Sequence, residues 1–180
     1  MISKIGVIGA GQMGSGIAQT FATAGYDVIL HDRADTPLKR GLESIEKNLG
    51  RQASRNKISE QQGQDVFARI TGTTNFSEFK NSDLVIEAAT ENEDLKKEIF
   101  KGVTPHLNKH AILATNTSSI SITSLASVTD RPEKVIGMHF MNPVPVMQLV
   151  EVIRGLGTDD ETYTSIICLL YTSPSPRDRG

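Results

Sequence analysis

The sequence contains one cysteine and no tryptophan, and its charges nearly cancel. A single thiol, Cys168, cannot form an internal disulfide, and it excludes a cysteine-rich metal site. The 19 basic and 21 acidic residues give a formal charge of −2, so no basic excess points to a nucleic-acid surface. No apolar run reaches the roughly 18 residues of a membrane-spanning helix. These absences predict a globular domain that binds no nucleic acid, membrane or metal.

The 180 residues are enough for one domain or slightly more, with a core that needs no cross-links. The chain begins with a strand-like run that leads into glycines and lacks the basic start of a signal peptide. A reducing, cytoplasmic compartment is therefore expected. Cys168 lies in an apolar run and is predicted to be a buried, inert thiol.

Residues 171–180 differ in composition from the rest of the chain. They carry two prolines and no apolar periodicity, directly after the helix-like run 166–170. A natural disordered terminus has this character, but an abrupt break inside a helical pattern is more typical of a run-on or adaptor-derived translation. We therefore expect a domain over residues 1–170, followed by a non-native tail.

Apolar patterns along the chain alternate between strand and helix. Residues 2–8 are predicted to form a strand, 15–24 a helix and 28–30 a second strand. The polar stretch 37–69 is predicted to form two helices broken near Arg55 and Asn56. Further strands are predicted at 84–86, 111–113, 135–138 and 149–150, and helices at 92–104 and 121–127. This alternation predicts an α/β fold, a Rossmann-type doubly wound and mostly parallel sheet with a helical-hairpin excursion after the second strand.

A glycine-rich motif joins the first strand to the first helix. It has the pattern G-x-G-x-x-G and consists of Gly9, Ala10, Gly11, Gln12, Met13 and Gly14. Glycines at these spacings allow a tight turn, close approach of a pyrophosphate and close helix–strand packing. Asp32 ends the second strand, where a carboxylate binds the ribose hydroxyls of NAD and repels the extra phosphate of NADP. The motif predicts an NAD site, with some NADP tolerance because of Arg33; the alternative is a ligand-free turn and a solvated Asp32.

Oxidation of an alcohol by a nicotinamide cofactor needs a base near neutral pH, and histidine is the natural candidate. His31 lies on the adenosine side, and His106 and His110 lie in a polar connection that is predicted to be solvated. His139 instead follows the strand 135–138, at the sheet edge where such folds bind ligands. His139 is therefore the best candidate for the base, with a purely structural histidine as the alternative.

Glu151 is the predicted partner of this histidine. It lies within the apolar run 149–153, where burial of an unpaired charge is costly. His139 precedes it across a short proline-containing connection, 142–145. A carboxylate on the far imidazole nitrogen would fix the tautomer and raise the basicity of the ring. The alternative is a Glu151 side chain that faces solvent on an edge strand. Glu87 is a second acid in a buried strand, and no role is assigned to it.

Polar side chains follow two of the predicted strands. Asn116 and Ser118 come after the strand 111–113, and Asn142 follows His139 closely. They are candidates to donate hydrogen bonds to a carbonyl or hydroxyl at the reacting carbon. For Ser118, capping of the next helix is the alternative.

Several of these segments together resemble the 3-hydroxyacyl-CoA dehydrogenase family, and its bacterial members most of all. The segments are 7–18, Asn116-Thr117-Ser118-Ser119, His139-Phe140-Met141-Asn142-Pro143 and 149–152. The match extends from residue 1 to about 165 in one register, and the His-Phe-x-Asn-Pro segment is far more specific than the glycine motif. Met141 departs from the phenylalanine that is common in the family.

The resemblance implies a reversible, NAD-dependent oxidation of (S)-3-hydroxyacyl-CoA to 3-oxoacyl-CoA in fatty-acid or butyrate metabolism. In this family His139 would be the general base, and Glu151 would orient and polarise it. Ser118 and Asn142 would hold the reacting oxygen and the nicotinamide side of the site. Further cofactor contacts would come from Glu91 and Lys96. The hairpin 37–69 would reach over the CoA, with suitable positive charge on Arg51, Arg55 and Lys57.

The family also implies a second, all-helical domain that closes the acyl-CoA site and forms a homodimer. Without it, we expect NAD binding, little turnover and an exposed apolar surface. Two alternatives stay open. One is another β-hydroxyacid dehydrogenase, such as the 3-hydroxyisobutyrate type, which uses a lysine base and lacks the His-Phe-x-Asn-Pro segment. The other is a non-catalytic NAD-binding protein like the lens crystallins of this family.

Overall fold

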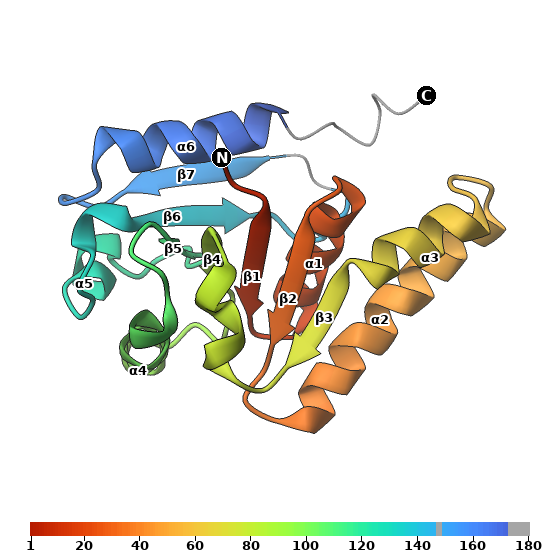
Figure 1. Cartoon of the computed structure of the whole chain (residues 1–180), viewed down its shortest axis with the longest axis horizontal. Helices are drawn as coiled ribbons and strands as arrows, with labels where there is room; N and C mark the ends of the chain where they lie inside the picture. Colours follow the sequence, from red (N-terminus) through yellow and green to blue (C-terminus); the bar gives the residue numbers. More distant parts are fainter. Residues whose placement is uncertain (147–148, 173–180) are drawn as a thin grey trace.

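In the part of the chain that the structure describes, seven strands form one sheet, which is shown in Figure 1. The computed structural model describes residues 1–146 and 149–172. The strands are β1 (Lys4–Ile8), β2 (Asp27–His31), β3 (Ile70–Thr73), β4 (Leu84–Glu87), β5 (Ile112–Thr115), β6 (Val135–Phe140) and β7 (Val150–Arg154). Their order is β3-β2-β1-β4-β5-β6-β7, and among these described strands only the β6–β7 pair is antiparallel. The predicted doubly wound, mostly parallel sheet is confirmed.

Helices cover both faces of this sheet because its strands are apolar on both sides. The helices are α1 (Gln12–Thr23), α2 (Asp35–Ser54), α3 (Glu60–Ala68), α4 (Glu93–Val103), α5 (Ile122–Ala126) and α6 (Asp160–Thr172). In β4, Leu84 and Ile86 join the core beneath α1, α2 and α6, while Val85 joins the core beneath α4 and α5. This alternation follows from the pleat of a strand, which turns successive side chains to opposite faces.

The polar excursion forms the predicted helical hairpin, which lies at the β3 edge of the sheet in Figure 1. Its two helices are separated at 55–59, where Asn56 has a φ of 56°. Asparagine tolerates this left-handed conformation better than most residues. Ser59 then begins α3 through a capping box with Gln62. The predicted break near Arg55 and Asn56 is confirmed.

Strand β3 is absent from the sequence prediction. Its four residues, Ile-Thr-Gly-Thr, include a single large apolar side chain, and none of the four is buried. An edge strand needs little apolar content, because its backbone hydrogen bonds to β2 supply the pairing. Strand β7 is longer than predicted and antiparallel, and α1 begins at Gln12, so the glycine motif includes its first turn.

The C-terminal helix departs from the predictions in two ways. Helix α6 continues through Tyr171 and Thr172, past the expected domain end, and residues 173–180 of the expected tail lie outside the described residues. Cys168 is exposed, so the predicted buried thiol is wrong, because helix α6 buries Ile166 and Leu169 but turns Cys168 toward solvent. Among the described residues, no helix is long and apolar enough to cross a membrane.

Candidate functional site

The glycine-rich turn lies at the carboxyl end of β1, in the centre of the sheet. Gly9 has a φ of 103°, which favours glycine, and its amide donates to the His31 carbonyl at 2.8 Å. A Cβ on Gly14 would lie 1.7 Å from the Gly9 carbonyl oxygen, so the helix can pack this closely only through glycine. The chain therefore passes from β1 into α1 within a very tight turn.

Gly11 leaves room in front of this turn. A Cβ built on it meets no atom within 4 Å, and this residue caps α1 without a side-chain hydrogen bond to the helix. Amide groups of the first helical turn are thus free of a side-chain cap, and the helix dipole makes this end attractive to an anion. These features fit the pyrophosphate of a dinucleotide.

Asp32 follows β2 beside the same turn. Its Oδ2 accepts a hydrogen bond from the Ala10 amide at 3.0 Å, which brings the predicted ribose-binding carboxylate against the glycine motif. The turn and the acid are therefore adjacent, as the strand–helix–strand unit requires.

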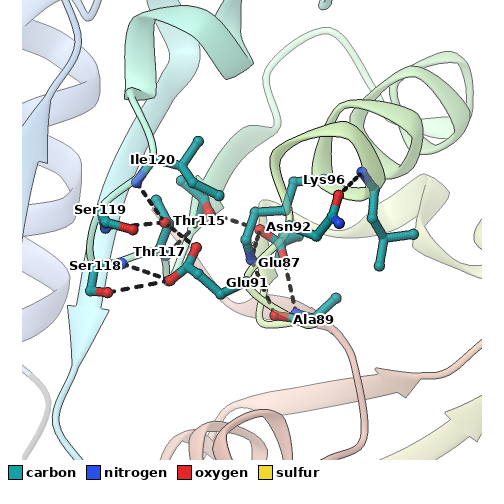
Figure 2. Close-up of polar contacts among 11 residues, drawn as sticks. Glu87, Ala89, Glu91, Asn92, Lys96, Thr115, Thr117, Ser118, Ser119 and Ile120 are labelled. Carbon is teal, nitrogen blue, oxygen red and sulfur yellow. Dashed lines mark hydrogen bonds and ion pairs between the residues drawn. The ribbon is translucent and has the colours of Figure 1, made fainter.

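The turn 88–92 and the end of β5 meet through Glu91, as Figure 2 shows. The Glu91 carboxylate accepts hydrogen bonds from the Thr117 hydroxyl, from the Ser118 amide at 3.2 Å and from the Ser118 hydroxyl at 3.3 Å. Burial alone would raise the pKa of Glu91, but the hydrogen bonds from Thr117 and Ser118 hold it below its ordinary value. Glu91 is thus an ionised anchor for Ser118.

Lys96 lies deeper, beneath the same turn. Its ammonium contacts Glu87 Oε2 at 2.7 Å, Glu87 Oε1 at 2.9 Å and the Ala89 carbonyl oxygen at 3.1 Å, and both charged side chains are buried. These contacts occupy its three donors. A direct cofactor contact by Lys96 stays a prediction, and it would require the exchange of one of these bonds.

His139 and Glu151 face each other across the β6–β7 pair. They occupy opposite positions in the register, and His139 Nδ1 lies 3.4 Å from Glu151 Oε2. Strand β5 ends at Thr115, which pairs with Gly137, so His139 extends past the end of that strand. Asn116 Oδ1 accepts the Phe140 amide at 2.8 Å and so supports this extension of β6.

The burial expected for Glu151 is wrong. Its side chain is 53 % exposed, against 23 % for His139, because β7 is the edge strand of the sheet. The alternative of a Glu151 side chain that faces solvent is therefore correct for its exposure. The strand register still places its carboxylate beside the His139 imidazole. Glu87, in contrast, is fully buried in the central strand β4.

A cavity of about 690 Å³ lies between α1, α2 and the segment 142–146. Asn142 belongs to its lining, and its Oδ1 accepts a hydrogen bond from Gln12 Nε2 at 3.2 Å. Four cationic side chains line the hairpin side of this cavity: Arg40, Arg51, Arg55 and Lys57. The cavity therefore connects the end of the glycine motif to a basic wall.

The other three histidines lie away from the His139–Glu151 pair. His106 and His110 are exposed, as predicted, and His31 is buried against Phe76. Sequence reasoning missed Thr115 and Thr117, which hold Glu87 and Glu91. The sequence feature that could have identified them is a threonine at the end of a buried strand. This feature has little specificity, because threonine is common in strands.

A dinucleotide-binding Rossmann domain is the class of protein that this sheet, glycine turn and acidic strand end define. The family model described as "3-hydroxyacyl-CoA dehydrogenase, NAD binding domain" matches residues 4–172. The chain belongs to this family, and its cofactor is NAD.

Curated relatives support the same family. The chain is 50 % identical over 163 residues to a 3-hydroxybutyryl-CoA dehydrogenase of Bradyrhizobium diazoefficiens, which covers 91 % of this chain and 56 % of the relative. It is 52 % identical over 159 residues to a probable 3-hydroxybutyryl-CoA dehydrogenase of Deinococcus radiodurans, with 88 % and 57 % covered. The chain thus spans a little over half the length of these relatives.

Solved structures agree in fold. The crystal structure of (S)-3-hydroxybutyryl-CoA dehydrogenase PaaH1 from Ralstonia eutropha superposes with a TM-score of 0.92 at 46 % identity, over 95 % of this chain and 60 % of that one. Synechocystis arogenate dehydrogenase, at 15 % identity and a TM-score of 0.68, shares the fold alone.

Proposed function

We propose that this chain is the NAD-binding half of an enzyme that oxidises (S)-3-hydroxyacyl-CoA to 3-oxoacyl-CoA and runs the reaction in reverse. The observation that carries the proposal is the His139–Glu151 contact at the carboxyl edge of an NAD-binding sheet. When bound, NAD supplies the hydride acceptor. The names of the relatives support a short acyl chain such as hydroxybutyryl.

Residues of this chain transfer the proton and bind the reacting oxygen. His139 takes the hydroxyl proton through Nε2 during oxidation and returns it during reduction. Glu151, on Nδ1, fixes the tautomer and stabilises the imidazolium that forms. Asn142 donates a hydrogen bond to the oxygen through its side-chain amide, and Ser118 donates its single hydroxyl proton to the oxygen in exchange for its bond to Glu91.

The cofactor is held by the residues around the glycine turn and by residues that follow β2, β4 and β5, together with Lys96 on α4. They are Gly9, Ala10, Gly11, Gln12, Met13, Gly14, Asp32, Glu91, Lys96 and Asn116. Asp32 sets the preference for NAD, because its carboxylate would repel the additional phosphate of NADP.

The basic wall of the cavity between α1 and α2 suits the phosphates of CoA. Arg51, Arg55 and Lys57 line it on the hairpin side, and Asn142, in the segment after β6, lines it too. A CoA held along α2 would thus direct its acyl arm toward the segment that follows His139. Arginine pairs well with phosphate because its planar donors match the phosphate oxygens.

The proposal is tested in a longer protein that continues this chain to the full length of its relatives. It is expected to oxidise NADH with acetoacetyl-CoA, and His139→Gln is expected to lower kcat at least about a hundredfold, which is the low end for a general base. The dissociation constant for NADH should stay unchanged in that variant. Near-normal kcat in His139→Gln would remove this residue from the mechanism. NADH binding with no turnover by the parent protein would instead favour the non-catalytic alternative.

A further inference from the structure

Glu87 and Lys96 form a buried ion pair at the centre of the sheet's carboxyl edge. Their side chains are 0 % and 2 % exposed. In β4, Glu87 has the same orientation as Val85, toward α4, and Lys96 comes down from the first turns of that helix. The Thr115 hydroxyl on the neighbouring strand donates to Glu87 Oε1 at 2.7 Å. Burial of two charges is costly, and every contact that lowers the cost also fixes their positions.

The pair holds both polar groups of one backbone residue. Glu87 Oε2 accepts the Ala89 amide at 2.7 Å, and Lys96 Nζ donates to the Ala89 carbonyl oxygen at 3.1 Å. Figure 2 shows the Glu87 and Lys96 side chains meeting at Ala89. A pair of apolar side chains of the same size could fill this space but could not bind the amide and the carbonyl of Ala89.

The turn that is held in this way touches both parts of the site. Ala88 donates its amide to the Ile8 carbonyl at 2.8 Å, and its own carbonyl oxygen would lie 2.8 Å from a Cβ on Gly9. Three residues further on, Glu91 anchors the hydroxyl and the amide of Ser118. The turn 88–92 therefore links the glycine motif to the end of β5.

The topology indicates which half of a dinucleotide this turn borders. Strand order reverses between β1 and β4, and such folds bind a dinucleotide across that point. Asp32, on the β2 side, is at the adenosine half. The turn 88–92 leaves β4 on the other side, together with β5 and β6, and therefore borders the nicotinamide half.

We propose that Glu87 and Lys96 are positioning residues that fix the turn 88–92 as a wall of the nicotinamide half of the NAD site. They act through the Ala89 peptide and, through Glu91, on Ser118. This inference rests on the NAD site of the proposed function and assigns a role to two charges that lie beneath that site.

Two ligands separate positioning from a general loss of stability. NADH contains the nicotinamide, whereas ADP-ribose lacks it and keeps the adenosine and the pyrophosphate. For Lys96→Met, we expect the dissociation constant of NADH to rise about tenfold, the effect of losing one hydrogen bond from a charged group, and that of ADP-ribose to change less than about twofold. Titration calorimetry on the 180-residue chain measures both, and thermal unfolding of each variant is recorded beside them.

Two further variants keep the test decisive if an unpaired Glu87 impairs folding. The double variant Glu87→Gln/Lys96→Met removes both charges of the pair, so it should regain stability yet still bind NADH weakly, because the Ala89 carbonyl has lost its donor. Thr115→Val keeps both charges and the side-chain shape. It should weaken NADH about threefold, because it loosens Glu87.

Arg131→Met is the matched control. Arg131 is also buried and also donates to backbone carbonyls, those of Asn108 and Ala111, but these precede β5 at the opposite edge of the sheet. It should lower stability and leave NADH affinity unchanged. Wild-type NADH affinity in the double variant, or equal losses for NADH and ADP-ribose in Lys96→Met, would overturn the inference. A loss of NADH affinity in Lys96→Met with none in Thr115→Val would overturn it too, because it would indicate a direct contact of Lys96 with the cofactor. A parent chain that binds neither ligand would contradict the proposed function instead.

Discussion

Gly11 and Gly14 lie three residues apart in one turn, yet an added methyl group meets different surroundings at each. At Gly14 it would overlap the Gly9 carbonyl oxygen, and at Gly11 it meets nothing within 4 Å. The glycine at 14 is therefore required by the fold of the free protein. The fold does not require the glycine at 11. The absence of a side chain there is explained only if a ligand approaches this residue.

This contrast gives a prediction for Gly11→Ala. The variant should fold with a loss of about 1 kcal/mol or less, from the weaker helix cap, because its φ of −71° suits alanine. Its affinity for NADH should fall at least about tenfold, because the methyl group occupies the path of the pyrophosphate. Thermal unfolding and NADH titration measure the two effects. Gly14→Ala, as the comparison, should give no folded protein; unchanged NADH affinity in Gly11→Ala would show that nothing binds in front of this turn.

Helix α2 carries its positive charge on two different sides. Arg51 and Arg55, at its C-terminal end, line the cavity beside α1, whereas Lys39 and Lys47 are exposed outside that cavity. The position of a charge around the helix, rather than the net charge of the hairpin, therefore determines which side attracts an anion.

Removal of the cavity charges should weaken CoA binding selectively. Arg51→Gln/Arg55→Gln is expected to raise the dissociation constant of CoA about tenfold or more, because two charge-assisted contacts to phosphate are lost, and to leave NADH unaffected. Lys39→Gln/Lys47→Gln makes the same charge change on the same helix and should have little effect. Calorimetric titration with CoA compares the pairs. Equal weakening by both would mean that the hairpin attracts CoA only through its overall charge.

The stability of the whole molecule is coupled to pH through a histidine outside the proposed chemistry. His31 is 4 % exposed and stacks on Phe76 at a ring distance of 4.4 Å. Among the described residues, no hydrogen-bond partner meets its buried Nδ1. Burial lowers the pKa of His31 below 6.5, against the opposing effects of the Thr74 backbone and the Asp32 charge.

The sign of the pH effect follows from proton binding. Below about pH 6.5 the unfolded chain binds a proton at His31 that the folded chain resists, so the free energy of unfolding falls as the pH is lowered. The melting temperature should therefore drop between pH 7.5 and 5.5, and His31→Phe, which keeps an aromatic ring beside Phe76, should reduce that drop. His106→Gln removes an exposed histidine and should behave like the parent. An equal drop in His31→Phe and the parent would exclude His31 as the cause.

Local patterns were sufficient to predict most elements and the contact between His139 and Glu151. The spacing of apolar residues is set by the geometry of a helix or a strand, so it can be recognised without neighbours. The glycine motif lies between a strand and a helix for the same reason, and His139 and Glu151 are close because a short connection joins two antiparallel strands. These features depend on residues that are near each other in the chain.

The tertiary structure determined which charged side chains are buried and which residues they contact. Glu87 and Glu151 occupy similar apolar runs, but one lies in the central strand beneath α4 and the other on the edge strand, so only Glu87 is buried. Lys96 covers Glu87, and Glu91 holds Ser118, through contacts between separate elements. Whether a charge is buried depends on which distant elements pack over it, so local periodicity determined the strands and helices here, while their packing assigned the ion pair and the exposed carboxylate.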